Sequence, residues 1–217
     1  MKFDKNFKTY DNQAQVQKSV AKNLIELIDK KFYKNILELG CGTGIFTKLL
    51  KENLTYDSLD LNDYFDSREY FTDIPFNNFF VGDMSTLNFE KYSLICSSSA
   101  IQWIENMDLL FSKISKATDE FIFSIYIKEN LQEIKNHFNI SLNYKNSEEI
   151  FNLLKKYFKD VTYSEETFNL NFSTPLDALK HLKKTGVTGL GKSSISLIKS
   201  YKETTLTYKV AYFICKN

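Results

Sequence analysis

Proline, glycine, cysteine and arginine are all scarce in this chain. Only two prolines and seven glycines occur among 217 residues, which leaves little material for flexible linkers, so we expect one continuous domain. The three cysteines, Cys41, Cys96 and Cys215, are scattered and odd in number. Neither a CxxC pair nor a histidine cluster accompanies them, which argues against a disulfide framework and against a metal site.

Long hydrophobic runs are also missing. The first ten residues are charged and contain no apolar segment typical of a secretion signal, and no later run reaches the length of a membrane span. We therefore expect a cytoplasmic protein without a membrane partner. The formal net charge is only +1, which argues against the broad basic face of a nucleic-acid enzyme. The single arginine, Arg68, is attributed to genome composition.

Charge is unevenly distributed along the chain. From Ala178 to the C-terminus there are eight lysines and one acid, Glu203. Two interpretations stay open: a basic surface that steers an acidic partner, or solvated lysines on ordinary helix faces.

A glycine-rich turn stands out against this background. Ile36–Leu39 predicts a strand, Gly40–Gly44 a tight turn, and Ile45–Leu50 a helix that begins at once. The N-terminus of such a helix favours a polar or anionic group. Asp60 ends the next apolar segment, at a distance that suits hydrogen bonds from ribose hydroxyls. The pattern predicts a nucleoside cofactor.

The glycine spacing favours one cofactor over another. The dinucleotide fingerprint G-x-G-x-x-G requires glycine where this chain has Ile45. The stretch resembles motif I of the S-adenosylmethionine (SAM) dependent methyltransferases, E-x-G-x-G-x-G, at Glu38, Gly40, Gly42 and Gly44. Within it, Cys41 is interpreted as a small residue tolerated where the backbone binds, rather than as a nucleophile.

Strand and helix patterns alternate through most of the chain. Strands are predicted at 36–39, 56–60, 78–81, 92–97, 120–127, 161–172 and 206–215, and helices at 13–30, 47–51, 108–116, 147–158, 175–184 and 193–201. We predict an α/β fold: a Rossmann-like, seven-stranded, mostly parallel sheet with helices on both faces. Residues 1–217 form a single domain in this interpretation, with an N-terminal arm at about 1–30 and helical lid insertions at about 128–160 and 174–203 over the carboxyl ends of the strands.

A second, narrower resemblance begins at the fourth predicted strand. Ser97–Trp103 resembles the S-N-x-A-x-Q-W segment of the malonyl-acyl-carrier-protein O-methyltransferases of biotin synthesis. Three other stretches are similar to that family: Phe7–Gln17 to its N-terminal arm, Leu182–Val187 to its L-K-x-x-G-A segment, and Leu206–Tyr208 to its L-T-Y. The chain departs from the family at Lys116–Asp119, where a Pro-Gly-Gly-like turn is usual.

The resemblance implies SAM as the cofactor and a set of residues that contact it. The glycines would cradle the methionine part, Asp60 would hold the ribose and Asp83 the adenine amino group, with Leu61 and Met84 on either side of the ring. Taken alone, Asp83 is also typical of a turn. The full set of cofactor candidates is Tyr10, Gln17, Glu38, Gly40, Cys41, Gly42, Gly44, Asp60, Leu61, Asp83, Met84 and Ser99.

The implied reaction is methyl transfer to the free carboxylate of malonyl-acyl-carrier protein, or of malonyl-coenzyme A, giving the methyl ester that primes pimelate synthesis for biotin. A carboxylate with a pKa of about 4 is already ionised at neutral pH, so no general base is required. Four residues are expected to face the substrate: Ser98, Ser99, Gln102 and Trp103. The acidic carrier protein is expected to dock near Lys180, Lys183, Lys184 and Lys192.

Two other functions stay open at this stage. One is a methyltransferase of the same fold that acts on another small acid or amine. The other is a nucleotide-binding protein that uses NAD or lacks catalysis.

Overall fold

A computed structural model describes residues 14–185 and 193–217. Its strands form one seven-stranded sheet in the order β3-β2-β1-β4-β5-β7-β6. They are β1 Phe32–Leu39, β2 Thr55–Asp63, β3 Asn78–Val81, β4 Leu94–Ser98, β5 Glu120–Tyr126, β6 Asp160–Asn171 and β7 Thr205–Lys216. Every pair from β3 to β5 is parallel, and β7 runs antiparallel to both of its neighbours. The predicted α/β class and mostly parallel sheet are confirmed.

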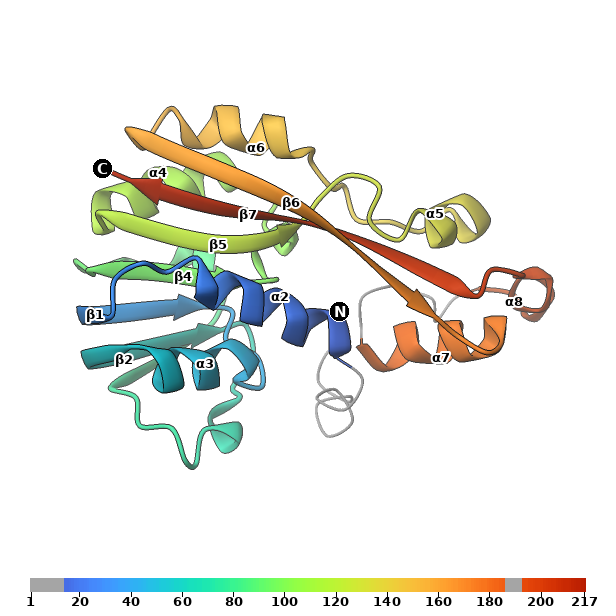
Figure 1. Ribbon diagram of the computed structural model, residues 1–217, viewed down its shortest axis with the longest axis horizontal. Coiled ribbons are helices and arrows are strands. Elements are labelled where there is room, and N and C mark those ends of the chain that lie inside the picture. Colours follow the sequence, from blue (N-terminus) through green and yellow to red (C-terminus); the bar gives the residue numbers. More distant parts are fainter. Residues whose placement is uncertain (1–13, 186–192) are drawn as a thin grey trace.

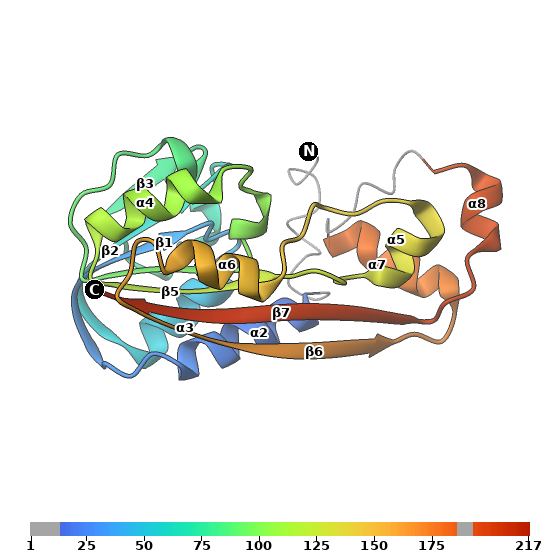
Figure 2. The same ribbon diagram turned by 90° about the horizontal axis from the view of Figure 1, so that it is seen from above.

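Helices cover both faces of this sheet. One face carries α2 Gln15–Glu26 and α3 Ile45–Asn53, and the other carries α4 Met107–Ala117 and α6 Ser147–Leu154 (Figures 1 and 2). Three short 3-10 turns are η1 Arg68–Tyr70, η2 Met84–Thr86 and η3 Ile101–Trp103. Within α2, Val16, Val20 and Leu24 recur on one helical face and are buried, which is the spacing that packs a helix against a sheet.

Each face of the sheet has its own apolar core. Ile36 of β1 points into the core under α2 and α3, whereas Leu37 and Leu39 point into the core under α4 and α6, as alternation along a strand requires. No helix in the two described ranges combines the length and the apolarity needed to cross a bilayer.

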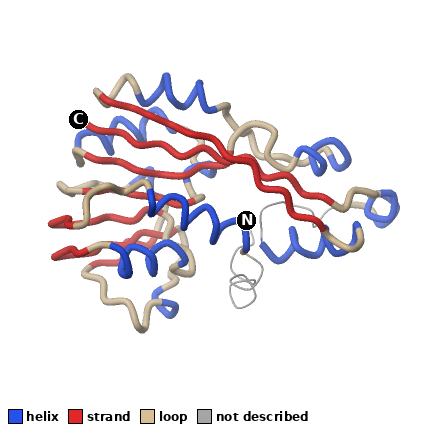
Figure 3. The backbone as a smooth tube through the Cα atoms, viewed as in Figure 1, coloured by secondary structure: helices blue, strands red, loops and turns tan. Residues whose placement is uncertain are grey.

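The two long strands β6 and β7 extend past the carboxyl ends of the parallel strands (Figures 1 and 3). Beyond those ends lie α5 Gln132–Phe138, α7 Pro175–Thr185 and α8 Ile195–Ser200, which we call the lid. Its apolar residues, among them Ala178, Leu182 and Tyr201, belong to the same core as α2 and α3. The lid helices α7 and α8 fall within the predicted insertion at about 174–203, whereas α6, within the one predicted at about 128–160, packs on a face of the sheet. The sequence pattern predicts no helix at α5.

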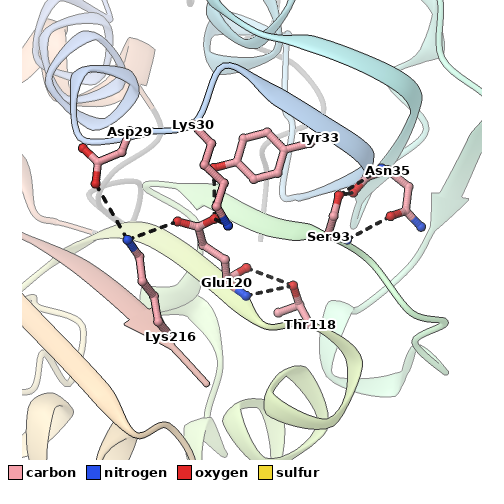
Figure 4. A network of polar contacts seen from close by, with 8 residues as sticks. All are labelled: Asp29, Lys30, Tyr33, Asn35, Ser93, Thr118, Glu120 and Lys216. Carbon is pink, nitrogen blue, oxygen red and sulfur yellow. Dashed lines mark hydrogen bonds and ion pairs between the residues drawn. The ribbon is translucent and has the colours of Figure 1, made fainter.

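At the opposite, amino end of the sheet, a polar cluster joins three distant parts of the chain (Figure 4). The buried carboxylate of Glu120 accepts a hydrogen bond from the Tyr33 hydroxyl at 3.0 Å and pairs with Lys30 at 3.0 Å and Lys216 at 3.7 Å. Burial, and then the Glu120 charge, raise the pKa of Tyr33 far above its usual value. The phenol is therefore a constant hydrogen-bond donor that ties β1 to β5.

Removing this carboxylate is expected to cost stability without affecting activity. We expect Glu120→Ala to lower the free energy of unfolding by about 2–3 kcal/mol, because the buried Tyr33 hydroxyl loses its partner. Glu120→Gln keeps an acceptor and should lose less. Urea denaturation measures both, and equal losses would contradict the hydrogen-bond explanation.

Candidate functional site

The glycine turn after β1 is packed closely against the turn after β4. Gly40 has a φ of +72°, and a Cβ atom at this position would lie 2.3 Å from the Cβ of Ala100, so only glycine fits. The N–H groups of Gly40 and Cys41 both donate to the Asn62 carbonyl of β2, at 2.8 and 2.9 Å. The ends of three strands therefore meet at Gly40.

Gly42 lies on the open side of the same turn. Its φ is +55°, and apart from its chain neighbours no atom of the described residues lies within 4 Å of the place a Cβ would occupy. Its N–H donates to Oδ2 of Asp63 at 2.8 Å. The turn thus combines exposed backbone with a carboxylate at its edge, which is the arrangement expected of a nucleoside cradle.

Strand register explains which side chains share this edge. Leu39 pairs with Asn62 and Glu38 pairs with Cys96, so Gly40, one residue past β1, is level with Asp63 on one side and with Ser98 on the other. Ser98 in turn pairs with Ser124 of β5. Asp63, Gly40, Ser98 and Ser124 therefore form one row along the carboxyl edge, and we call them the edge row.

Asp60 lies outside the edge row. The prediction that the second strand ends at Asp60 is wrong, because β2 continues to Asp63. Asp60 pairs with Leu37 and is therefore about 10 Å below the edge at 3.3 Å per residue. Its carboxylate accepts hydrogen bonds from the Tyr92 hydroxyl at 2.8 Å and from the Asn78 side chain at 2.9 Å. The Asp60 side chain therefore stabilises the sheet and does not reach the glycine turn.

The expected adenine contact Leu61 is corrected for the same reason. Its side chain is 0% exposed and packs in the core under α2 and α3, so it offers no surface to a ligand. Tyr64, directly after Asp63, is 65% exposed and is the aromatic side chain that the lengthened strand brings to the edge. The second acid in Asp60-Leu61-Asn62-Asp63 is the sequence signal that could have indicated the later strand end.

Met84 and Asp83 do lie beside the glycine turn. The Met84 Cε atom is 3.4 Å from the position of a Cβ on Gly40. Asp83 caps η2, and its Oδ1 accepts hydrogen bonds from the Ser85 backbone N–H at 2.8 Å and from its hydroxyl at 2.7 Å. The Asn62 side chain donates to the carbonyls of Phe80 and Gly82, which fixes the end of β3 next to β2.

The predicted substrate-facing residues follow β4 directly. Ser98 ends the strand, Ser99 has a φ of +56°, and Gln102 and Trp103 lie half-buried in η3. The Gln102 amide nitrogen donates to the Ser99 carbonyl at 2.5 Å. Two buried atoms here, Ser99 Oγ and Gln102 Oε1, have no hydrogen-bond partner among the described residues. These four residues therefore lie on the segment that leads from β4 into η3, around Ala100, which packs against Gly40.

Glu38 is a buried carboxyl group beneath the turn. Burial raises its pKa to about 8; the nearby Thr47 hydroxyl opposes the shift and the Asp63 carboxylate adds to it. Its Oε2 atom has no hydrogen-bond partner among residues 14–185 and 193–217. Burial likewise raises the pKa of Asp63 and that of the Cys41 thiol, so Cys41 is no thiolate nucleophile. Two poorly neutralised carboxyl groups therefore flank a cradle that suits a cationic ligand.

The Glu38 carboxyl group should make the ligand-free protein less stable as pH rises. Below about pH 4.5 the Glu38 carboxyl is neutral in the folded and unfolded states alike, whereas between 4.5 and 8 only the unfolded state ionises freely. We expect Glu38→Gln to raise the free energy of unfolding at pH 8 by about 2 kcal/mol. Thermal unfolding measured from pH 4.5 to pH 8 checks this, and a gain that does not shrink toward pH 4.5 would refute it.

The remaining candidates lie around this centre or outside the described ranges. Gln17 is on the buried face of α2, and Gly44, with a φ of +83°, begins α3. Tyr10 and Lys192 fall in the parts of the chain that the structure leaves undescribed. Lys180, Lys183 and Lys184 are exposed on α7 of the lid.

Known proteins resemble this chain over most of its length. Residues 12–182 match the model of a methyltransferase domain. A malonyl-acyl-carrier-protein O-methyltransferase of Calditerrivibrio nitroreducens is 34% identical, over 94% of this chain and 90% of its own length. The enzyme of that name from Bacteroides thetaiotaomicron is 33% identical, over 99% of this chain and 86% of its own.

A solved structure shows the same fold. The phosphoethanolamine N-methyltransferase 2 of Haemonchus contortus, in complex with S-adenosyl-L-methionine, superimposes with a TM-score of 0.59 at 18% identity, over 93% of this chain and 52% of that chain.

Proposed function

This chain belongs to the family of malonyl-acyl-carrier-protein O-methyltransferases, and we propose that it methylates the free carboxylate of malonyl-acyl-carrier protein with SAM. The product is the malonyl methyl ester that primes pimelate synthesis for biotin. Similarity to relatives of this name along nearly the whole chain carries the proposal. We also propose a cytoplasmic location, which the three buried free thiols at Cys41, Cys96 and Cys215 support.

The residues at the glycine turn fit SAM. The ligand is cationic at its sulfonium and ammonium groups, and the turn offers the unpartnered Oε2 of Glu38 and the open face of Gly42. We assign the ribose hydroxyls to Asp63, and the adenine to Tyr64, Met84 and Asp83. When bound, SAM supplies an electrophilic methyl group.

The chain's own contribution to the reaction is alignment and exclusion of water. A malonyl carboxylate is ionised at neutral pH and needs no base to deprotonate it. The two histidines are engaged in the lid: His181 packs on Phe172 with ring centres 5.1 Å apart, and Nε2 of His137 contacts the Leu197 carbonyl at 2.9 Å. Holding the attacking oxygen, the methyl carbon and the sulfur in line is the catalytic requirement.

An assay with purified protein and SAM tests the function. We expect a methyl ester on malonyl-acyl-carrier protein, and a lower rate with malonyl-coenzyme A because it lacks the docking surface of the carrier. Acetyl-acyl-carrier protein, which has no free carboxylate, is the matched control. Methylation of another small acid or amine in place of malonyl carriers would overturn the proposal.

The assignment of the ribose to Asp63 is tested with a pair of matched variants. We expect Asp63→Asn to raise the SAM dissociation constant about tenfold, through loss of a charge-assisted hydrogen bond. Asp60→Asn should change the SAM dissociation constant by no more than about twofold, since the Asp60 side chain already accepts hydrogen bonds from Tyr92 and Asn78. Titration calorimetry with SAM measures both dissociation constants. A larger increase in Asp60→Asn than in Asp63→Asn would indicate that Asp60 binds the ribose.

The lid offers a surface for the acidic carrier protein. On α7, Ala178 and Leu182 are completely buried, while Lys180, Lys183 and Lys184 point to solvent. Lys180 makes an exposed ion pair with Asp177 at 3.3 Å, which competes weakly with a partner. Figure 2 shows α7 at the lid end of the molecule, away from α3 and α4. We propose this lysine face as the docking site.

Charge reversal on α7 tests the docking site. Lys183→Glu with Lys184→Glu should raise the KM for malonyl-acyl-carrier protein about tenfold at low salt, and less at 0.15 M salt, where exposed charges are screened. The KM for malonyl-coenzyme A should stay unchanged. Lys155→Glu with Lys159→Glu, two exposed lysines between α6 and β6, is the matched control. An equal loss in both double variants would refute a specific docking site.

A further inference from the structure

Ser99 adopts a backbone conformation that its residue type disfavours. Its φ of +56° is in the left-handed region, where a Cβ atom is strained and glycine is normally found. The strain occurs at the carboxyl end of β4, next to Ala100, which contacts the cofactor turn at Gly40. Strained residues persist where the surroundings hold them in place.

Ser124 of β5 supplies most of that restraint. The Ser99 N–H donates to both the carbonyl and the hydroxyl oxygen of Ser124, each at 3.1 Å. Ser124 is completely buried, and its hydroxyl lies 3.4 Å from that of Ser98. On the other side, the Gln102 amide nitrogen holds the Ser99 carbonyl. The backbone of Ser99 is thus fixed from two directions.

The Ser99 hydroxyl has no hydrogen-bond partner in the described part of the protein. Its Oγ is buried, and a missing partner is unusual for a buried hydroxyl. A hydroxyl can donate to a carboxylate oxygen. Gln102 is the weaker candidate for that role: one N–H of its amide is used on the Ser99 carbonyl, and its unpartnered atom, Oε1, can only accept.

A guanidinium clamp for the substrate is not available from this chain. The one arginine, Arg68, makes two hydrogen bonds to Asp66, at 2.9 and 2.6 Å, on the exposed surface near η1. The edge row contains no cation either. Among the described residues of this edge, the donors that could recognise a carboxylate are therefore neutral.

We propose that the Ser99 hydroxyl donates the hydrogen bond that distinguishes the malonyl carboxylate, and that Ser124 is a positioning residue that presents it. The inference rests on the proposed function and adds a specificity determinant to it. Ser124 acts only through the conformation of Ser99.

Ser99→Gly is the most direct test, because glycine adopts the same φ without strain. We expect this variant to fold at least as stably as the wild type. Its preference for malonyl- over acetyl-acyl-carrier protein, measured as binding in the presence of S-adenosylhomocysteine, should fall about ten- to a hundredfold. The loss should appear as a higher KM for malonyl-acyl-carrier protein. An unchanged preference would overturn the proposal.

Ser124 is tested by removal and by conservative replacement. Ser124→Ala should reduce the malonyl preference in the same direction as Ser99→Gly, and Ser124→Thr, which keeps the hydroxyl, should restore most of it. Ser97→Ala is the matched control, because the Ser97 hydroxyl is also buried but donates to the Leu39 carbonyl at 2.8 Å; the preference should persist in this variant. A preference that survives Ser124→Ala would overturn the positioning role.

Failure of the proposed function has a different signature. In that case the wild type itself shows no preference for malonyl- over acetyl-acyl-carrier protein and forms no methyl ester. A wild type that has both properties, together with Ser99→Gly and Ser124→Ala variants that keep them, would overturn only the inference about the two serines.

Discussion

The contact between Gly40 and Ala100 is the constraint on which the candidate site depends. Because Gly40 has no Cβ, the Ala100 methyl group packs directly against its backbone, and the turn after β1 lies close to the turn after β4. Parallel pairing then aligns Asp63 with Gly40 on one side and Ser98 on the other. The packing of Ala100 against Gly40 therefore puts the proposed cofactor site after β1 next to the proposed substrate site after β4.

Several groups near this contact are held in states that cost the protein stability. Glu38 is buried without a cation, and Ser99 is held in a strained conformation with an unused hydroxyl. The amino end of the sheet is better paired: one Glu120 oxygen accepts hydrogen bonds from Tyr33 and Lys30, and the other lies 3.7 Å from the Lys216 ammonium group (Figure 4). The buried carboxylate is paired with cations at this end of the strands and not at the other, as expected when a ligand completes the second end.

The order and type of most elements could be predicted from local pattern. All seven strands and the helices on both faces follow apolar spacing that is specific to strand or helix. The short helix α5 was missed because only Ile134 and Phe138 are buried in it; two apolar positions do not make a periodic signal. Boundaries were less predictable, since a strand ends where its neighbours stop pairing.

The sequence by itself determined the cofactor class and the family, because the glycine spacing from Gly40 to Gly44 and the Ser97–Trp103 segment are local chemistry that needs no fold to be recognised. Only the tertiary structure decided which acid and which serines share the edge. Asp60 and Asp63 are indistinguishable by pattern, but the pairing of β2 with β1 puts Asp60 level with Leu37, inside the sheet, and Asp63 at its edge beside Gly42. Ser124 had no local signal at all, since its role arises from contact with a residue twenty-five positions earlier.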